Sequence, residues 1–332
     1  MRRREFIGGT IAAAMLSRAG AQPVTARKRL AIYSPSEPSA QMQEDSENRY
    51  YRALFAELRR LGQVVDDNLI VERWGAEKAG AGAPALVEEV IRSNPDVIYV
   101  VGLGALLFKR ATSTIPVVAL TADPVAQGLA ASLARPGGNF TGVSVDTGPS
   151  IHGKRIALLR EMYPKLRRLA FITLRGAWEG PQGPSVRAAA TAAGVEVIEC
   201  LVDFPTTEAS YQDLIARIRP DGADAIMVGD SPDVMTKRAA ITAKIASIAL
   251  PAIYPLADFV DVGGLMTYSF DLVELNKRAA NNIDAILRGT APGEIPFYQA
   301  SKFELALNLR TAKALSLDVP ATLLASADRV VE

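Results

Sequence analysis

The sequence predicts an α/β protein of two doubly wound lobes, each built around a parallel sheet. Strand-like and helix-like segments alternate from Arg29 onward, a pattern typical of right-handed βαβ units. The alternation restarts after Ser150 with a second unit of similar size. A third part, from Gly263 onward, is too short for a domain, so we expect the chain to cross back and complete both sheets. At 332 residues the chain is long enough for two lobes with separate cores.

In the first unit, short apolar runs predict strands, and apolar residues at helical spacing predict helices. The expected strands are 29–34, 68–74, 96–102, 115–121 and 140–145. The helices expected between them are 48–62, 84–94, a short stretch through Phe108, and 123–134. Gly62 is a C-terminal stop for the first helix, while Asp123 as N-cap and Pro124 at the first helical position begin the last one.

The second unit follows the same rules. Strands are expected at 168–174, 195–202, 224–230 and 250–255, with helices at 150–164, 184–194, 211–219 and 231–247. Beyond Gly263 the pattern predicts a strand at 265–269, a helix at 272–289, an extended stretch at 295–307 and a last helix. We therefore assign 28–145 plus 264–292 to an N-terminal lobe, and 146–263 plus 293–332 to a C-terminal lobe.

Residues 1–21 predict a secretory signal peptide. A basic start is followed by an apolar run from Phe6 to Leu16 and by small residues up to Ala21, after which cleavage is expected. Arg3-Arg4 with Phe6-Ile7 resembles the twin-arginine export signature, although general secretion stays open. The apolar run is well short of the ~20 residues that a membrane-spanning helix needs. The expected location is therefore the periplasm.

Composition excludes several classes of function. The formal net charge of +1 argues against a nucleic-acid partner, because phosphate binding needs an excess of Lys and Arg. With Cys200 as the single cysteine, no intramolecular disulfide and no cysteine-based metal site can form. With His152 as the single histidine, most nucleophile–base pairs and zinc sites are also excluded by count. We expect His152 to be a surface residue on its helix. No metal, no cofactor and no enzymatic activity are predicted.

The pair Gly137-Gly138 looks at first like a phosphate-binding loop. Such a loop follows a strand and precedes a helix, so that backbone N–H groups face the anion. Here the order is reversed, because a predicted helix precedes the glycines and the strand beginning at Phe140 follows them. The pair also falls at the edge of the sheet opposite to the ligand edge. We therefore interpret these glycines as structural and expect no nucleotide.

Segments 111–144, 251–269 and 288–332 keep an order and spacing that resemble the ABC-transporter substrate-binding proteins of the tryptophan/tyrosine-binding type. The resemblance extends from about Arg29 to the C-terminus. It implies the fold of type I periplasmic binding proteins, in which two α/β lobes are joined by three crossings and close on a small solute. The crossings are expected at 144–150, 261–265 and 293–299. The resemblance also implies a monomer that delivers its solute to the membrane subunits of an ABC permease.

Two loops depart from the family pattern. Relatives commonly carry an Asn-Pro pair after the first strand of the second lobe, where this chain has 172–183, "ITLRGAWEGPQG". The loop 34–45, "SPSEPSAQMQED", is longer and more acidic than usual. Because both loops are expected to face the cleft, the identity of the ligand does not carry over from the resemblance.

The carboxyl ends of the strands give the candidate binding residues, since ligands of doubly wound sheets bind at that edge. They are Ser34, Ser36, Gly102, Gly104, Thr121 and Asp123 in the first lobe, and Thr173, Arg175, Trp178, Asp230, Ser231 and Tyr254 in the second, with Tyr268 on the returning strand.

Several of these residues have a structural alternative. Asp123 and Asp230 each precede an expected helix start, so a capping role competes with a ligand contact. Ser36 is equally compatible with an ordinary turn. Arg175 and Trp178 lie in an irregular loop, where an Arg could pair with a carboxylate and a Trp could stack on a ring, or both could be solvated.

The predicted function is the binding of a small organic solute, amino acid-like or an aromatic carboxylate, between two lobes. Aromatic walls are expected from Trp178, Tyr254 and Tyr268. If Arg175 replaces the missing Asn-Pro contact, the preferred ligand is an acid without an amino group. A ligand-sensing periplasmic protein and a hydrolase that uses Asp123 and Asp230 as acid and base are the alternatives.

Overall fold

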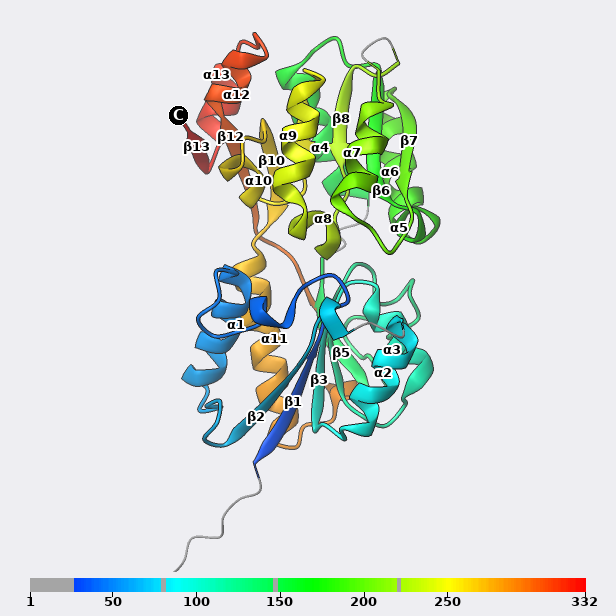
Figure 1. Ribbon diagram of the computed structural model, residues 1–332, viewed down its shortest axis with the longest axis vertical. Helices are drawn as coiled ribbons and strands as arrows, with labels where there is room; N and C mark the ends of the chain where they lie inside the picture. Colours follow the sequence, from blue (N-terminus) through cyan, green and yellow to red (C-terminus); the bar gives the residue numbers. More distant parts are fainter. Residues whose placement is uncertain (1–26, 79–81, 146–148, 220–221) are drawn as a thin grey trace, which may run out of the picture.

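The computed structural model describes residues 27–78, 82–145, 149–219 and 222–332, and it has two lobes stacked along the long axis (Figure 1). Each lobe contains one sheet covered by helices on both faces, so the predicted architecture of two α/β lobes is confirmed. The proposed signal peptide, 1–21, lies outside the described residues. Within the described ranges, no helix combines the length and apolar character needed to cross a membrane.

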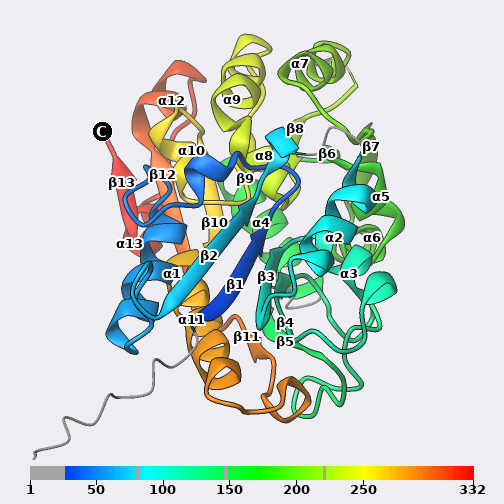
Figure 2. The same cartoon turned by 60° about the horizontal axis from the view of Figure 1, so that its bottom comes forward.

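The first lobe contains a sheet whose paired strands all run parallel. Its strand order is β11 (Tyr298–Gln299), β5 (Phe140–Ser144), β4 (Val117–Thr121), β3 (Val97–Val101), β1 (Lys28–Tyr33) and β2 (Leu69–Trp74). Figure 2 shows helices α1 (Arg49–Arg60) and α11 (Leu272–Leu287) on one side of this sheet, with α2 (Ala83–Arg92) and α3 (Gly104–Ala111) on the other. Covered on both faces, β3 and β4 are almost continuously apolar, as expected for parallel strands.

The second lobe contains a larger sheet with one antiparallel pair, β10 with β12. Its order is β13 (Arg329–Val331), β12 (Phe303–Asn308), β10 (Met266–Phe270), β9 (Ala252–Tyr254), β8 (Ala225–Val228), β6 (Arg168–Leu174) and β7 (Glu196–Val202). Its longer helices are α4 (Pro149–Met162), α6 (Gln182–Ala193), α7 (Glu208–Ala216) and α9 (Arg238–Ser247). Shorter ones are α5 (Arg175–Glu179), α8 (Pro232–Thr236), α10 (Asp258–Asp261), α12 (Leu309–Ala314) and α13 (Ala321–Ser326).

Single 3₁₀ turns lie at Ser39–Gln41, Ala76–Lys78 and Pro292–Glu294.

The assignment of the third part to the two lobes requires correction. Strand β10 pairs with β9 through Met266 and Ile253, so it belongs to the second sheet and not to the N-terminal lobe. Strand β11 pairs with β5 through Tyr298 and Val143, so it belongs to the first sheet. The chain therefore crosses between β5 and α4, around Asp271, and between β11 and β12. Buried strands of both sheets have the same apolar character, so their sequence does not reveal which sheet they join.

The helix expected at 123–134 is absent from the structure. Residues after Pro124 form turns instead, with the N–H of Gln127 bonded to the carbonyl of Asp123 at 3.0 Å. Gly128 adopts φ +66°, a left-handed conformation that ends any helix begun at Pro124. Gly137 adopts φ +78°, a left-handed conformation that favours glycine and agrees with its structural interpretation, although it follows turns and not a helix.

Candidate functional site

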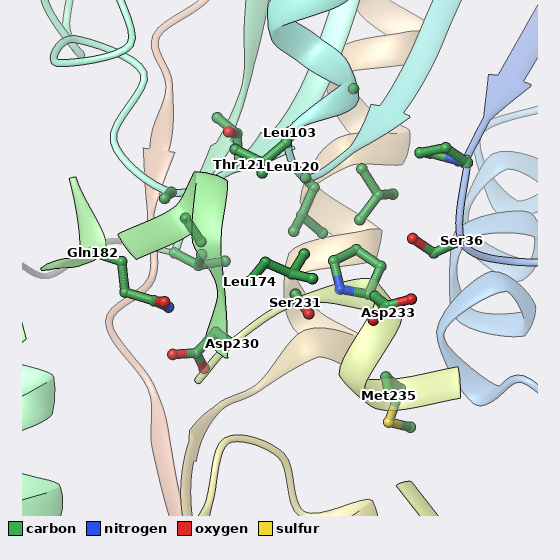
Figure 3. A pocket seen from close by; sticks show the side chains of 18 of the residues that line it. Ser36, Leu103, Leu120, Thr121, Leu174, Gln182, Asp230, Ser231, Asp233 and Met235 are labelled. Carbon is green, nitrogen blue, oxygen red and sulfur yellow. The ribbon is translucent and has the colours of Figure 1, made fainter. Parts of the chain in front are cut away.

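A cavity of about 460 Å³ lies between the two lobes, at the carboxyl ends of strands from both sheets. The first lobe contributes the segments that follow β1, β3 and β4, and the second contributes those that follow β6 and β8. Figure 3 shows Ser36, Leu103 and Thr121 facing Leu174, Asp230 and Ser231 across this space. The cavity therefore occupies the place where doubly wound sheets bind ligands, shared here by two sheets.

Most of the cavity wall is apolar. Aliphatic side chains and a proline from both lobes surround the space, and tyrosines and phenylalanines add ring surface. These residues are Val101, Leu103, Leu107, Leu120, Leu174, Pro232, Met235, Leu256, Tyr50, Tyr51, Tyr99, Phe204 and Phe270. A few polar groups in an otherwise apolar cavity are typical of sites for small organic molecules, in which apolar contact provides affinity and polar contacts fix orientation.

The first lobe places one buried carboxyl group, Glu37, at the cavity. The hydroxyl of Tyr51 donates a hydrogen bond to Glu37 Oε2 at 2.8 Å, and the amide of Asn48 donates to Oε1 at 3.0 Å. Burial raises the pKa of Glu37 above its ordinary value, while the hydrogen bonds from Tyr51 and Asn48 act in the opposite direction. Glu37 is therefore held in one orientation by neutral donors and has no ion-pair partner among the described residues.

The second lobe places a carboxylate at the cavity that is held by a fully buried arginine. Asp230 follows β8, and Arg155 lies on α4 with none of its side chain exposed. The guanidinium donates from Nη1 to Asp230 Oδ2 at 2.7 Å and from Nη2 to Oδ1 at 2.9 Å. It also donates to the backbone carbonyls of Tyr268, at 2.8 Å, and Pro255, at 3.2 Å. This bidentate pair fixes the Asp230 carboxylate at the cavity wall.

His152 corrects a sequence prediction, because it lies at the cavity wall and not on the surface. Its exposure is 4 %, and its ring meets Phe171 edge-on at 6.3 Å. Burial lowers the pKa of His152 to about 4, the charge of Arg155 adds to this effect, and Asp230 opposes it. The imidazole is therefore neutral at neutral pH. Helix α4 packs against both α6 and the sheet. His152 is therefore buried, although the sequence of α4 places it on a face that looks polar.

Two further side chains, Asp233 and Ser231, stiffen the second-lobe wall. Asp233 is buried in α8 and accepts hydrogen bonds from Tyr211 at 2.6 Å, Thr206 at 2.5 Å and Lys237 at 2.6 Å. Ser231 caps the same helix by accepting from the N–H of Val234 at 3.1 Å. The start of α8 is thus fixed before any solute binds.

The structure brings only some of the predicted residues to the cavity. Those that line it are Ser36, Gly102, Gly104, Thr121, Asp230 and Ser231. Ser34 is buried beside Glu37, and the Thr173 hydroxyl holds Gln182, a cavity residue, through a hydrogen bond of 2.5 Å to Oε1. Asp123 caps the turn after β4 by accepting from the N–H groups of Val125 and Ala126, so its structural alternative is the one observed.

The aromatic and cationic contacts predicted for the second lobe are absent from the cavity wall. Arg175 pairs with Asp203 at 2.6 Å, and both side chains are largely exposed. Trp178 is 4 % exposed and packs on Phe171, because the loop forms the short helix α5 and turns the indole inward.

The two remaining aromatic candidates pack against other rings of the second lobe, where Tyr254 is buried and Tyr268 is half-buried. Tyr254 stacks on Phe259 with ring centroids 4.9 Å apart, and Tyr268 stacks on Phe303 at 5.5 Å. Neither ring is among the described residues that line the cavity. The aromatic rings at the wall are instead Tyr50, Tyr51 and Tyr99 of the first lobe and Phe204 and Phe270 of the second.

Residues missed by the sequence analysis fall into two groups. Tyr50, Tyr51, Tyr99 and Asn276 lie within helices or a strand, where the spacing of the apolar residues around them indicates core packing. Glu37, Gln182 and Asp233 lie just beyond strands or in the segments after them, so strand ends extended by a few residues would have included them.

Contacts across the cleft hold the lobes together beside the cavity. Arg49, at the start of α1, donates to Asp258 of α10 at 2.9 Å, and the Tyr50 hydroxyl donates to the same carboxylate. At another point Gly102 approaches Pro232 so closely that an added Cβ would lie 3.2 Å from the proline ring. The two walls of the cavity are therefore in contact around its margin.

Two α/β lobes with an apolar cavity between them and three crossings of the chain define a solute-binding protein of the type I periplasmic binding protein fold. The chain belongs to the ABC transporter substrate binding protein family, whose sequence model matches residues 39–331. A curated relative, the tyrosine-binding protein of Clostridioides difficile, is 24% identical over 261 residues, which cover 76% of this chain and 72% of the relative.

Solved structures share the fold. A conserved domain protein from Vibrio cholerae superposes with a TM-score of 0.79 at 22% identity, covering 92% of this chain and 99% of that one. An ABC domain from Streptococcus pneumonia in complex with L-Trp gives a TM-score of 0.77 at 20% identity, covering 92% of this chain and 100% of that one. At these identities the likeness establishes the fold.

Proposed function

We propose that this protein is the solute-binding component of an ABC import system and works outside the cytoplasm. It holds a small organic solute between its lobes and delivers the solute to a membrane permease. The observation that carries the proposal is the apolar cavity at the ligand edge of both sheets. Contacts from both lobes allow a bound solute to bridge them, and the crossings supply the few residues that a hinge needs.

The proposed solute is amino acid-like with an aromatic body. The wall offers ring and aliphatic surface suited to an aromatic group, and a volume of about 460 Å³ suits a molecule of that size. The relatives named for tyrosine and L-Trp binding make the same class a reasonable starting point. A sugar or polyol fits poorly, because each of its hydroxyls needs a polar partner that an apolar wall does not provide.

The geometry argues against the hydrolase alternative. Asp123 caps a turn, and both oxygens of Asp230 accept hydrogen bonds from Arg155. A hydrolase needs an acid and a base that face the same substrate, whereas Asp123 is not among the described residues that line the cavity. We therefore interpret these carboxylates as binding and structural groups.

Calorimetry with L-tryptophan, L-tyrosine and L-phenylalanine, and with sorbitol as a polyol, tests the proposal. At least one aromatic amino acid is expected to bind. Gly176 lines the cavity and has open space around an added Cβ, so Gly176→Phe should fill the site and weaken binding at least ~10-fold. Gly138→Phe is the matched control, because Gly138 is exposed in open space elsewhere. Binding of sorbitol alone, or unchanged affinity in Gly176→Phe, would contradict the proposal.

Export through the twin-arginine route is a separate prediction. Replacing Arg3 and Arg4 by Lys preserves the charge but removes the paired arginines that the export receptor reads. We expect the precursor to accumulate in the cytoplasm, measured by cell fractionation and immunoblotting. Mature protein that still reaches the periplasm at the normal level would show that general secretion exports it.

A further inference from the structure

One end of the cavity presents hydrogen-bond acceptors rather than positive charge. Asp230 lines the cavity with 20% of its side chain exposed, and Figure 3 shows its carboxylate on the second-lobe wall. Its partner Arg155 cannot reach a solute, since it is fully buried and donates to Asp230 and to two backbone carbonyls. A solute at this wall therefore meets carboxylate oxygens, each with remaining capacity to accept a hydrogen bond.

His152 provides a second polar group in the same region. It precedes Arg155 by three residues on α4, and this spacing places both side chains on one face of the helix. Its ring lines the cavity, yet Nδ1 is buried without a hydrogen-bond partner. A buried polar atom normally has a partner, because leaving it unpaired costs free energy. An imidazole with one unpaired nitrogen, at the wall of an otherwise apolar cavity, is therefore accounted for if a solute contacts the ring.

The charges of the remaining wall point the same way. Among the described residues that line the cavity, there is neither a Lys nor an Arg, whereas Glu37, Asp230 and Asp233 are present. Arg175, which the sequence suggested as a partner for a ligand carboxylate, is engaged with Asp203 at the surface. An anionic group placed beside Asp230 would thus find no cation at the wall to pair with, because the guanidinium of Arg155 is already engaged with Asp230.

We propose that Asp230 and His152 form the polar end of the solute site and select a solute that presents a hydrogen-bond donor, such as an amine or amide. This inference rests on the proposed function and reverses the expectation of an acid without an amino group. The solute donates to Asp230, and the neutral ring of His152 makes a hydrogen bond to the same polar end. Asp230 and His152 thereby distinguish solutes that carry a hydrogen-bond donor from solutes that do not, while the apolar wall contacts the aromatic part of the solute.

Three probes that share a phenyl body separate the possible recognition groups. L-phenylalanine carries both an ammonium and a carboxylate, 2-phenylethylamine retains only the ammonium, and 3-phenylpropanoate retains only the carboxylate. We expect both amines to bind and 3-phenylpropanoate to bind at least ~10-fold more weakly than L-phenylalanine, because it leaves the polar end unpaired. Calorimetry provides the affinities.

Variants of α4 test the role of the ring. His152→Phe retains the contact with Phe171 but removes the ring nitrogens, so it should bind L-phenylalanine about tenfold more weakly while remaining folded. His152→Gln retains hydrogen-bonding capacity and should recover part of the affinity. Lys154→Gln, on the exposed side of the same helix, is the matched control and should bind like the parent. Thermal unfolding of each variant verifies that the fold is intact.

Because the chain contains one histidine, ¹⁵N labelling of histidine gives ring signals from His152 alone when the protein is purified without a histidine tag. Saturation with L-phenylalanine is expected to shift these ring signals. Binding that leaves them unmoved, or equal affinity for 3-phenylpropanoate, would overturn this inference and leave the proposed function intact. Failure of all three probes, together with the aromatic amino acids above, would contradict the proposed solute class and this inference with it.

Discussion

Replacing Arg155 by methionine is expected to lower the free energy of unfolding of the second lobe by about 3–5 kcal/mol. The side chain is fully buried and holds Asp230 through two hydrogen bonds of 2.7 and 2.9 Å. Methionine matches the aliphatic part of the arginine side chain but has no donor, so the carboxylate and the carbonyls of Pro255 and Tyr268 lose their partner. Urea unfolding followed by circular dichroism measures the change.

The matched control is Arg175→Met, which breaks an Arg–Asp pair of similar length at the surface. That pair joins Arg175 to Asp203, whose side chains are 47% and 70% exposed. Water and salt screen such a pair, so its loss should change stability far less than the loss of the buried pair. Equal effects of the two substitutions would show that the buried pair does not hold the cavity wall in place.

The Gly142→Ala substitution is expected to destabilise the first lobe by about 3–5 kcal/mol, which combines backbone strain with overpacking. Gly142 lies in β5 at φ +147°, and an added Cβ would lie 1.9 Å from the carbonyl oxygen of Ala119 on β4. These two strands must separate to accept the methyl group. Because Thr121 at the end of β4 lines the cavity, this movement should also disturb the binding site. The free energy of unfolding, measured with urea, and the affinity for the tightest-binding solute should both decrease.

Gly138→Ala is the control for this substitution. Gly138 precedes the same strand, but an added Cβ meets no atom within 4 Å. Its effect should stay within ~0.5 kcal/mol, as for most surface substitutions. Equal stability of Gly142→Ala and Gly138→Ala would contradict the conclusion that β4 and β5 pack too closely at Gly142 to accept a side chain.

The alternation of apolar strands and amphipathic helices was sufficient to predict two α/β lobes, because this pattern is local. The assignment of β10 and β11 to sheets was not, because Met266 and Tyr298 find their partners only through long-range pairing. The helix expected after Pro124 failed for a local reason, namely the left-handed conformation of Gly128. Glycine within a helical pattern is a signal that deserves more weight than the cap before it.

The candidate site divides in the same way. Residues at the ends of strands or within three residues of them, such as Thr121, Ser36 and Asp230, reach the cavity because parallel strands end at a common edge. Trp178 was misplaced because the direction of a loop side chain depends on how the loop packs, here as a short helix against Phe171. His152 was missed because burial depends on the elements that cover α4, which its own sequence does not specify.

Hydrogen exchange with and without the tightest-binding aromatic amino acid tests most directly whether the solute is held between the lobes. Saturation should slow exchange in both the peptide that spans the junction of β3 and α3, including Gly102 and Gly104, and the peptide that spans the junction of β8 and α8, including Asp230 and Ser231. Protection confined to one lobe, or to segments away from these junctions, would contradict binding in the cleft.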